Sequence, residues 1–114
     1  MDTVTIFLAK ALICFQGACH PVLLGEDTVP GTYAMTVLHT QQNGYGGDVL
    51  QYDYDDRSWY GIHRTFNNLE TRDRLYSRDA EARRYVTNGC PNVQPEVYEQ
   101  LRDCCRGMPL VIEE

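Results

Sequence analysis

The sequence lacks an apolar run long enough to cross a membrane, since no hydrophobic stretch approaches the roughly 18–20 residues of a spanning helix. It also lacks an excess of basic residues, and its formal net charge is -6. This charge argues against nucleic acid as a partner, because phosphates require a basic face, and it gives no attraction to anionic membranes. No C-x-x-C pair or His/Cys cluster has the spacing of metal ligands, so we expect no metal and no cofactor.

The first ten residues carry no basic region ahead of their apolar run, which stops at Lys10. We therefore interpret them as a first strand rather than as a signal peptide. Either a leader has been removed from this sequence or export uses another route. A length of 114 residues is typical of one domain, and we expect residues 1–114 to form a single core.

The chain has five cysteines, an odd number, so at least one stays unpaired within the chain. If residues 16–17 form a two-residue hairpin turn, Cys14 and Cys19 lie opposite each other, close enough for a disulfide bond. Two small buried hydrophobic residues are the alternative, and a bridge there would indicate an oxidising compartment. Cys104 and Cys105 are predicted to pack in the core, with a vicinal or inter-chain disulfide as the alternative.

The first half of the chain is predicted to be β structure, from its β-branched and aromatic composition. We expect strands at residues 3–15, 19–24 and 33–39, and within 49–62 on either side of a turn at 55–57. Residues 67–84 are highly charged and are predicted to be a solvated loop with a short helix near 79–84.

One helix is indicated at residues 95–106. Pro95 suits the first helical turn, Glu96 suits the positive N-terminal end, and Gly107 can end the helix. A closing strand is expected at 110–112. The chain is therefore predicted to be mainly β, with one principal helix placed after Cys90.

Two short motifs each contain a residue that could take part in catalysis, a histidine in one and a cysteine in the other. His63 closes the strand segment Gly61-Ile62-His63, and Cys90 lies in Thr87-Asn88-Gly89-Cys90-Pro91-Asn92. An imidazole near a cysteine acts as a general base or, as imidazolium, stabilises the thiolate, which makes the cysteine a usable nucleophile at neutral pH. The pair points to thiol acyl-transfer chemistry.

The order of these motifs resembles the catalytic domain of the L,D-transpeptidases, the YkuD-type enzymes of peptidoglycan. Residues 25–33 look like the family's T-P-x-G-x-[FY] segment after a one-residue adjustment, residues 61–63 like its G-[IL]-H element, and residues 87–92 like its [ST]-x-G-C-x-[NR] element. The resemblance covers about residues 3–113 and implies a β-sandwich or partly open barrel. Many members have histidine in place of Asn88 and arginine in place of Asn92, and residues 67–84 look like an inserted loop.

The resemblance implies a cysteine acyltransferase that acts on the tetrapeptide stem of peptidoglycan. Cys90 would attack the carbonyl at the L-centre of the diamino acid and expel D-alanine. The thioester would then pass to an amine, a D-amino acid or water, which corresponds to L,D-transpeptidase, exchange or L,D-carboxypeptidase activity. Backbone N–H groups around Cys90 would form the oxyanion hole, because negative charge develops on the carbonyl oxygen.

The predicted site combines these residues with nearby polar ones. Arg64 is the preferred partner of a substrate carboxylate, with Arg83 and Arg84 as alternatives on a charged segment. Thr87 and Asn88 would orient His63 or donate to the oxyanion. The predicted catalytic residues are Cys90, His63, Gly89 and Asn88, and the predicted substrate-binding residues are Arg64, Thr87, Tyr60 and Asn92.

The expected substrate implies a location in the periplasm or the cell wall. A leaderless toxin or a phage version of the same enzyme is an alternative, and would add a secretion or immunity partner. A catalytically inactive peptidoglycan-binding module, with Cys90 as a buried thiol, is another. A papain-like protease agrees less well, because its nucleophilic cysteine usually precedes its histidine.

Overall fold

The structure is a computed structural model that describes residues 3–42, 45–65 and 69–114. Its elements in chain order are β1 (Val4–Phe7), β2 (Leu12–Phe15), β3 (Ala18–Pro21), β4 (Gly31–Ala34), β5 (Thr36–His39), β6 (Asp48–Tyr54), β7 (Trp59–Arg64), α1 (Leu69–Leu75), α2 (Ala80–Arg84), β8 (Asn92–Val93), α3 (Pro95–Cys105) and β9 (Pro109–Glu113).

The strands form two mixed sheets. The larger has the order β3-β2-β1-β9-β4 and the smaller the order β5-β6-β7-β8. β1 and β9 are parallel, as are β7 and β8, while the other neighbours are antiparallel. Among the described strands the two sheets stay separate and do not close into a barrel. The predicted mainly β class is confirmed.

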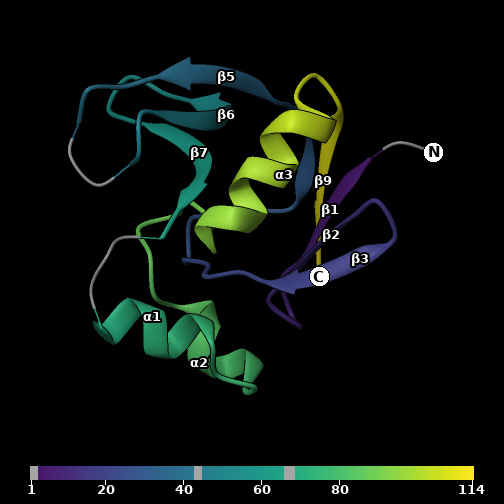
Figure 1. Ribbon diagram of the computed structural model, residues 1–114, viewed down its shortest axis with the longest axis vertical. Coiled ribbons are helices and arrows are strands. Elements are labelled where there is room, and N and C mark those ends of the chain that lie inside the picture. The colour runs from purple at the N-terminus through teal and green to yellow at the C-terminus, as the bar shows by residue number, and fades with distance from the viewer. Residues whose placement is uncertain (1–2, 43–44, 66–68) are drawn as a thin grey trace.

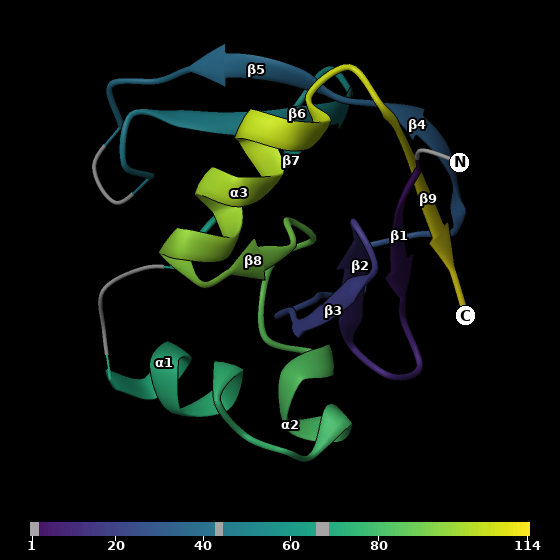
Figure 2. The same cartoon turned by 45° about the vertical axis from the view of Figure 1, so that its right-hand side comes forward.

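The helix α3 contributes to a core shared with both sheets. Its buried residues are Val97, Tyr98, Leu101 and Cys105, which recur at helical spacing. They belong to the same hydrophobic cluster as residues of β1, β2, β6, β7 and β9. In Figures 1 and 2, α3 lies against the four-stranded sheet, and α1 and α2 lie at the end of the molecule away from β5. The predicted helix and closing strand are confirmed as α3 and β9.

Two strand predictions are wrong because a turn interrupts each segment. Residues 3–15 are a hairpin, in which the Ala11 N–H donates to the Leu8 carbonyl at 3.2 Å and Ala11 takes a positive φ of 50°. Residues 8–11 contain neither Gly nor Pro, so the usual sequence signal of a turn is absent. Residues 33–39 divide at Met35: β4 pairs with β9 in one sheet and β5 with β6 in the other.

The prediction of a solvated loop within residues 67–84 is wrong over residues 69–75. α2 confirms the short helix, but α1 precedes it, and residues 67–68 lie outside the described ranges. Leu75 is buried. The buried Arg83 guanidinium donates to the carbonyls of Ser77, Lys10 and Ala11 at 2.6, 2.9 and 3.2 Å. A charged side chain that joins distant carbonyls cannot be distinguished by composition from a solvated one.

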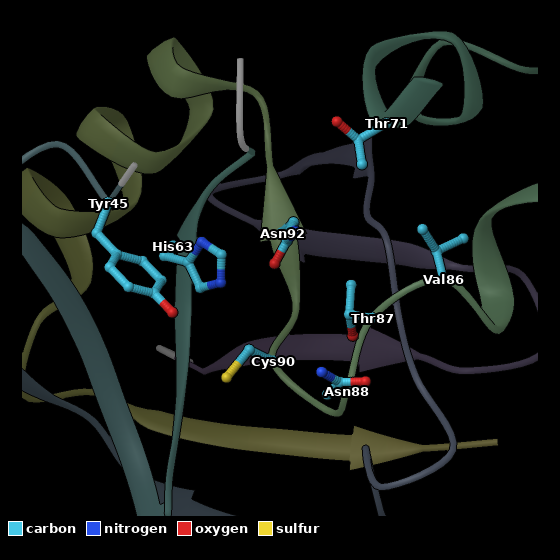
Figure 3. A pocket seen from close by; sticks show the side chains of 8 residues that line it. All are labelled: Tyr45, His63, Thr71, Val86, Thr87, Asn88, Cys90 and Asn92. Carbon is cyan, nitrogen blue, oxygen red and sulfur yellow. The ribbon is translucent and has the colours of Figure 1, made fainter. Parts of the chain in front are cut away.

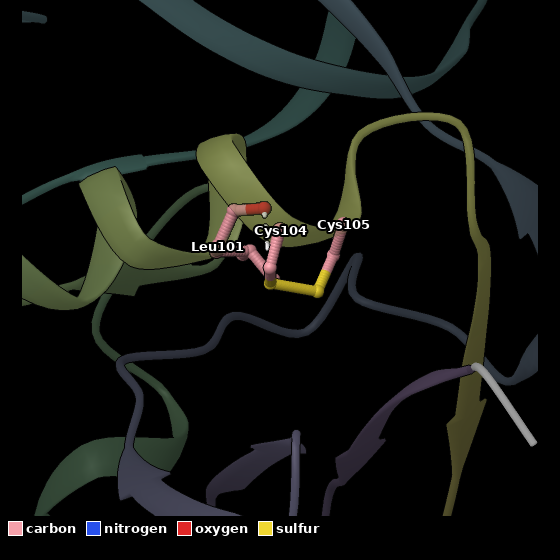
Figure 4. The surroundings of a disulfide bond; sticks show 3 residues. All are labelled: Leu101, Cys104 and Cys105. Atoms are coloured by element: carbon pink, nitrogen blue, oxygen red, sulfur yellow. Dashed lines mark hydrogen bonds between the residues drawn. A yellow bond between two sulfur atoms is a disulfide. The ribbon is translucent and has the colours of Figure 1, made fainter.

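Four of the five cysteines form disulfide bonds. Cys14 and Cys19 are cross-strand partners in β2 and β3 and are bonded, which decides between the two alternatives left open above. Cys104 and Cys105 form a vicinal disulfide at the end of α3 (Figure 4). Cys105 also packs in the core, so the prediction of core packing was incomplete rather than misplaced. Cys90 is a free thiol.

The described residues contain no group of three or more His, Cys, Asp or Glu side chains arranged to hold a metal ion. None of their helices has the length and hydrophobicity of a transmembrane segment.

Candidate functional site

His63 is held near the end of β7 by pairing with β8. Its backbone N–H donates to the Pro91 carbonyl at 3.1 Å, and it is the register partner of Asn92. The side chain is only 3% exposed. Because Cys90 immediately precedes Pro91, this parallel pairing brings the histidine and the cysteine loop together.

The loop that carries Cys90 is anchored on residues 24–28. The N–H groups of Val86 and Thr87 both donate to the Leu24 carbonyl, at 2.8 and 3.0 Å. A Cβ on Gly25 would overlap the Thr87 carbonyl oxygen, so this contact requires glycine. Within the loop, the Gly89 N–H donates to the Thr87 hydroxyl at 3.1 Å.

Gly89 occupies a position that other residues cannot take without strain. Its φ is +125°, in a region that L side chains rarely adopt. A Cβ there would also lie 2.9 Å from the Tyr60 ring and 3.0 Å from the Asp27 side chain. Tyr60 and Asp27 therefore lie against the backbone of Gly89, directly before Cys90.

His63 and Cys90 line one cavity of about 210 Å³. Figure 3 shows the Cys90 sulfur and the His63 ring on the same side of it, with Asn92 between the ring and Thr87. Three of its residues, Tyr45, Thr71 and Val86, were not predicted as site residues. The lining residues are Tyr45, His63, Thr71, Val86, Thr87, Asn88, Cys90 and Asn92.

The His63 ring is held in one tautomer. Its Nδ1 lies 2.7 Å from the Arg64 carbonyl oxygen. A carbonyl only accepts, so Nδ1 carries the proton, and in the neutral ring Nε2 is the acceptor nitrogen that a general base needs. Burial lowers the pKa of His63, and the hydrogen bond to Arg64 opposes this only in part. The imidazole is therefore neutral at pH 7.

The Cys90 thiol lies against the backbone of β7. Burial raises its pKa, while a hydrogen bond from the Gly61 N–H to the sulfur lowers it to a smaller extent. The sulfur is also 3.8 Å from the Trp59 carbonyl oxygen, which accepts from the thiol. Both shifts favour the uncharged forms, a neutral thiol and a neutral imidazole that line the same cavity.

Tyr45 packs on His63 from the loop before β6. The two rings meet edge to face with centroids 4.7 Å apart, and Tyr45 makes a similar contact with Trp59 at 5.5 Å. Tyr45 lies in a Gly/Asn-rich segment of the sequence, where an aromatic residue next to glycine was the only available signal. Thr71 was missed because its helix, α1, was predicted to be a loop.

Arg64 does not line the cavity. Its guanidinium donates to Asp48 Oδ1 at 2.9 Å and to the Tyr45 carbonyl at 3.0 Å, and it lies over the Tyr98 ring at 4.3 Å. Asp48 is also paired with Arg102 at 3.2 Å. These contacts give Arg64 a place in the packing of the Tyr45 loop, and its role as a carboxylate ligand stays a prediction.

The other predicted residues are divided between the cavity and its surroundings. Thr87, Asn88 and Asn92 line the cavity with His63 and Cys90. Tyr60 contacts Gly89 but lines a separate hollow that includes Asp27 and Tyr33. Of the two alternative cations, Arg83 is buried in the α2 region, and Arg84 is paired with Glu81.

The structure is similar to several solved L,D-transpeptidases. One from Mycobacterium tuberculosis has a TM-score of 0.65 at 12% identity, over 99% of this chain and 57% of that one. L,D-transpeptidase 3 from Mycobacterium tuberculosis, in complex with a faropenem-derived adduct, has a TM-score of 0.59 at 11% identity, over 99% and 60%. A mutant L,D-transpeptidase from Enterococcus faecium has a TM-score of 0.62 at 15% identity, over 97% and 49%.

No protein-family model matches the sequence, and no curated protein matches it. The chain spans less than two thirds of the length of each of the three solved structures above. At 10–15% identity the likeness concerns the fold. It agrees with the family suggested by the glycine–histidine and glycine–cysteine motifs, and the chain has the L,D-transpeptidase fold.

Proposed function

We propose that this chain is a peptidoglycan-modifying cysteine acyltransferase, with residues 1–114 as one catalytic domain that acts in the periplasm or the cell wall. The single observation that carries the proposal is the placement of His63 and Cys90 on one cavity within the L,D-transpeptidase fold. The donor would be the tetrapeptide stem, as in the L,D-transpeptidases that the motifs resemble.

The first half of the reaction forms a thioester. His63 Nε2 accepts the thiol proton while Cys90 Sγ bonds to the carbonyl carbon at the L-centre of the diamino acid. The negative charge moves to the carbonyl oxygen, and backbone N–H groups around Cys90 stabilise it. When the C–N bond breaks, His63 returns the proton to the leaving nitrogen of D-alanine.

The second half releases the acyl group. An amine, a D-amino acid or water attacks the thioester carbonyl and gives its proton to His63. The C–S bond then breaks, and His63 protonates the departing sulfur, which restores the starting pair. The Gly89 N–H is already bonded to the Thr87 hydroxyl. We therefore assign the oxyanion contact to N–H groups of the loop other than that of Gly89, and we assign Thr87 to the support of the loop.

The test is mass spectrometry of a disaccharide-tetrapeptide incubated with wild type, Cys90→Ala and Cys90→Ser, with and without D-methionine. Loss of D-alanine with wild type alone supports the proposal, and exchange for D-methionine identifies a D-amino acid as an acceptor. A folded wild type that leaves the substrate unchanged, yet binds it in calorimetry, would instead indicate an inactive binding module.

His63→Gln tests the base, and His39→Gln is its matched control because His39 is exposed on β5. Loss of one general base lowers the rate by about 10²–10⁴-fold. We expect this loss for His63→Gln and full activity for His39→Gln. Equal rates in the two variants would remove His63 from the mechanism.

A further inference from the structure

Asn92 presents an unsatisfied oxygen to the catalytic cavity. Its side chain is only 3% exposed, and its buried Oδ1 has no hydrogen-bond partner. The backbone of Asn92 is held on one side by hydrogen bonds of 2.9 and 2.8 Å exchanged with Leu23, and on the other by the pairing of β8 with β7. In Figure 3 the oxygen points into the space bordered by His63, Cys90 and Thr87. A buried acceptor in this position is complementary to a donor group on a ligand.

Among the described residues, the lining of the cavity contains no Lys or Arg that could pair with a carboxylate. The three arginines predicted as carboxylate ligands are engaged elsewhere: Arg64 with Asp48, Arg83 with backbone carbonyls and Arg84 with Glu81. A substrate side-chain carboxylate placed against Asn92 Oδ1 would lose its hydration and face another acceptor without gaining a cationic partner, which is unfavourable.

The adjoining surface is negative rather than positive. A second cavity, of about 410 Å³, shares Thr87 and Asn88 with the first and adds Glu26, Asp27 and Tyr85. Carboxylates at this boundary repel an anion and attract a cation. The negative charge around the cavity and the acceptor oxygen within it therefore both favour a ligand group that carries N–H donors, and both disfavour a carboxylate.

We infer that Asn92 is a specificity-determining residue that accepts a hydrogen bond from an N–H group on the acyl donor. The side chain of the donor residue beside the scissile bond would end in a carboxamide or an ammonium, and a carboxylate in the same place would be rejected. The inference rests on the proposed function, because it concerns the acyl donor of that same site.

The test uses three tetrapeptides that differ only in the side-chain end group of the third residue: carboxamide, carboxylate or ammonium. Release of D-alanine gives kcat/KM for wild type, and calorimetry with Cys90→Ala gives the dissociation constant of each peptide. One buried hydrogen bond corresponds to a preference of about tenfold to a hundredfold over the carboxylate peptide. Whichever of the carboxamide and ammonium peptides has the higher kcat/KM and the lower dissociation constant identifies the group that donates the N–H.

Two variants test the reason for the preference. Asn92→Asp places a negative charge at the unsatisfied oxygen. The ammonium peptide should then bind more tightly relative to the carboxamide peptide, and the carboxylate peptide should bind more weakly than it does to wild type. Val86→Lys brings a cation to the lining and should raise binding of the carboxylate peptide. Val29→Lys is the matched control, because Val29 is 49% exposed and does not line this cavity. It should leave the preference unchanged.

The outcomes separate the inference from the proposed function. A binding preference without D-alanine release supports the inference and overturns the proposed function. Turnover of all three peptides at equal kcat/KM supports the proposed function and overturns the inference. No binding of any peptide overturns both. An unchanged preference in a folded Val86→Lys variant also overturns the inference, and that variant remains informative if Asn92→Asp fails to fold.

Discussion

The Thr28 hydroxyl donates a hydrogen bond of 2.7 Å to the carbonyl of Gly89, which lies 61 positions further along the chain. The same hydroxyl accepts from the Gly25 N–H at 3.2 Å. One buried side chain thus connects the segment before β4 to the residue preceding Cys90. Cys90, the proposed nucleophile, is therefore positioned by a remote turn as well as by its own loop.

Thr28→Val should destabilise the protein and displace Cys90. The valine leaves the Gly25 N–H and the Gly89 carbonyl without partners, which costs about 1–3 kcal/mol. Urea unfolding measures the stability, and D-alanine release measures the activity. Thr28→Ser keeps the hydroxyl and should recover most of both. A Thr28→Val variant as stable and active as Thr28→Ser would show that the hydrogen bonds are dispensable.

Alkylation of Cys90 by iodoacetamide should be slow at neutral pH and should accelerate only at alkaline pH, because burial raises the thiol pKa. At constant substrate, the acyl-transfer rate should hold at pH 6.5 and fall only as the pH falls through the lowered pKa of His63, below the ordinary value of about 6.5. Rapid alkylation of Cys90 at mildly acidic pH would instead indicate a thiolate–imidazolium pair.

The depressed His63 pKa also gives a pH dependence of stability. The unfolded state binds a proton at about pH 6.5 and the folded state only at lower pH. The stabilisation is therefore complete above about pH 6.5 and is lost as the pH falls through the folded pKa. His63→Gln should flatten this part of the profile in urea titrations from pH 7 to 5, and an equally steep profile would contradict the assignment.

The Asp48 carboxylate should be needed for stability, because it is paired with Arg64 and Arg102 and its side chain is 11% exposed. Burial alone would raise its pKa, but hydrogen bonds and charge from the two arginines outweigh this and lower it. Its contribution is present above about pH 3.9 and is lost as the pH falls through the folded value.

Asp48→Asn should cost about 1.5–3 kcal/mol at pH 7, since it removes a buried charged partner from both arginines, which keep only the exposed carboxylates of Glu99 and Asp103. It should also reduce activity, because Arg64 holds the Tyr45 carbonyl. Glu81→Gln is the control: it removes an exposed pair with Arg84, so its cost should stay below about 1 kcal/mol. Equal midpoints for the two variants in urea would contradict the importance of the buried pair.

Thiol counting checks the cysteine assignment. Denaturation without a reductant, followed by iodoacetamide, should add one label, on Cys90, and prior reduction should allow five. Peptide mapping then distinguishes the vicinal pair from an inter-chain bond. A dimer that dissociates only on reduction would contradict the Cys104–Cys105 assignment.

Several features were predictable because they depend on neighbouring residues. Pro95, Glu96 and Gly107 indicated α3, and residues 87–92 could be recognised as the motif that contains Cys90. The turn at residues 8–11 was not predictable, since Ala11 adopts a positive φ without the glycine that usually marks one. The orientation of the Arg64 side chain was also not predictable from the sequence, because its partner Asp48 lies in a different strand.

The sequence by itself determined the mainly β class, the principal helix, and the glycine–histidine and glycine–cysteine motifs, since composition, periodicity and backbone preference act over a few residues. Only the tertiary structure decided that His63 and Cys90 share a cavity, that Arg64 turns toward Asp48 and that Asn92 Oδ1 is left unsatisfied there. These relationships depend on the parallel pairing of β7 with β8 and on burial, and both are set by contacts between residues far apart in the chain.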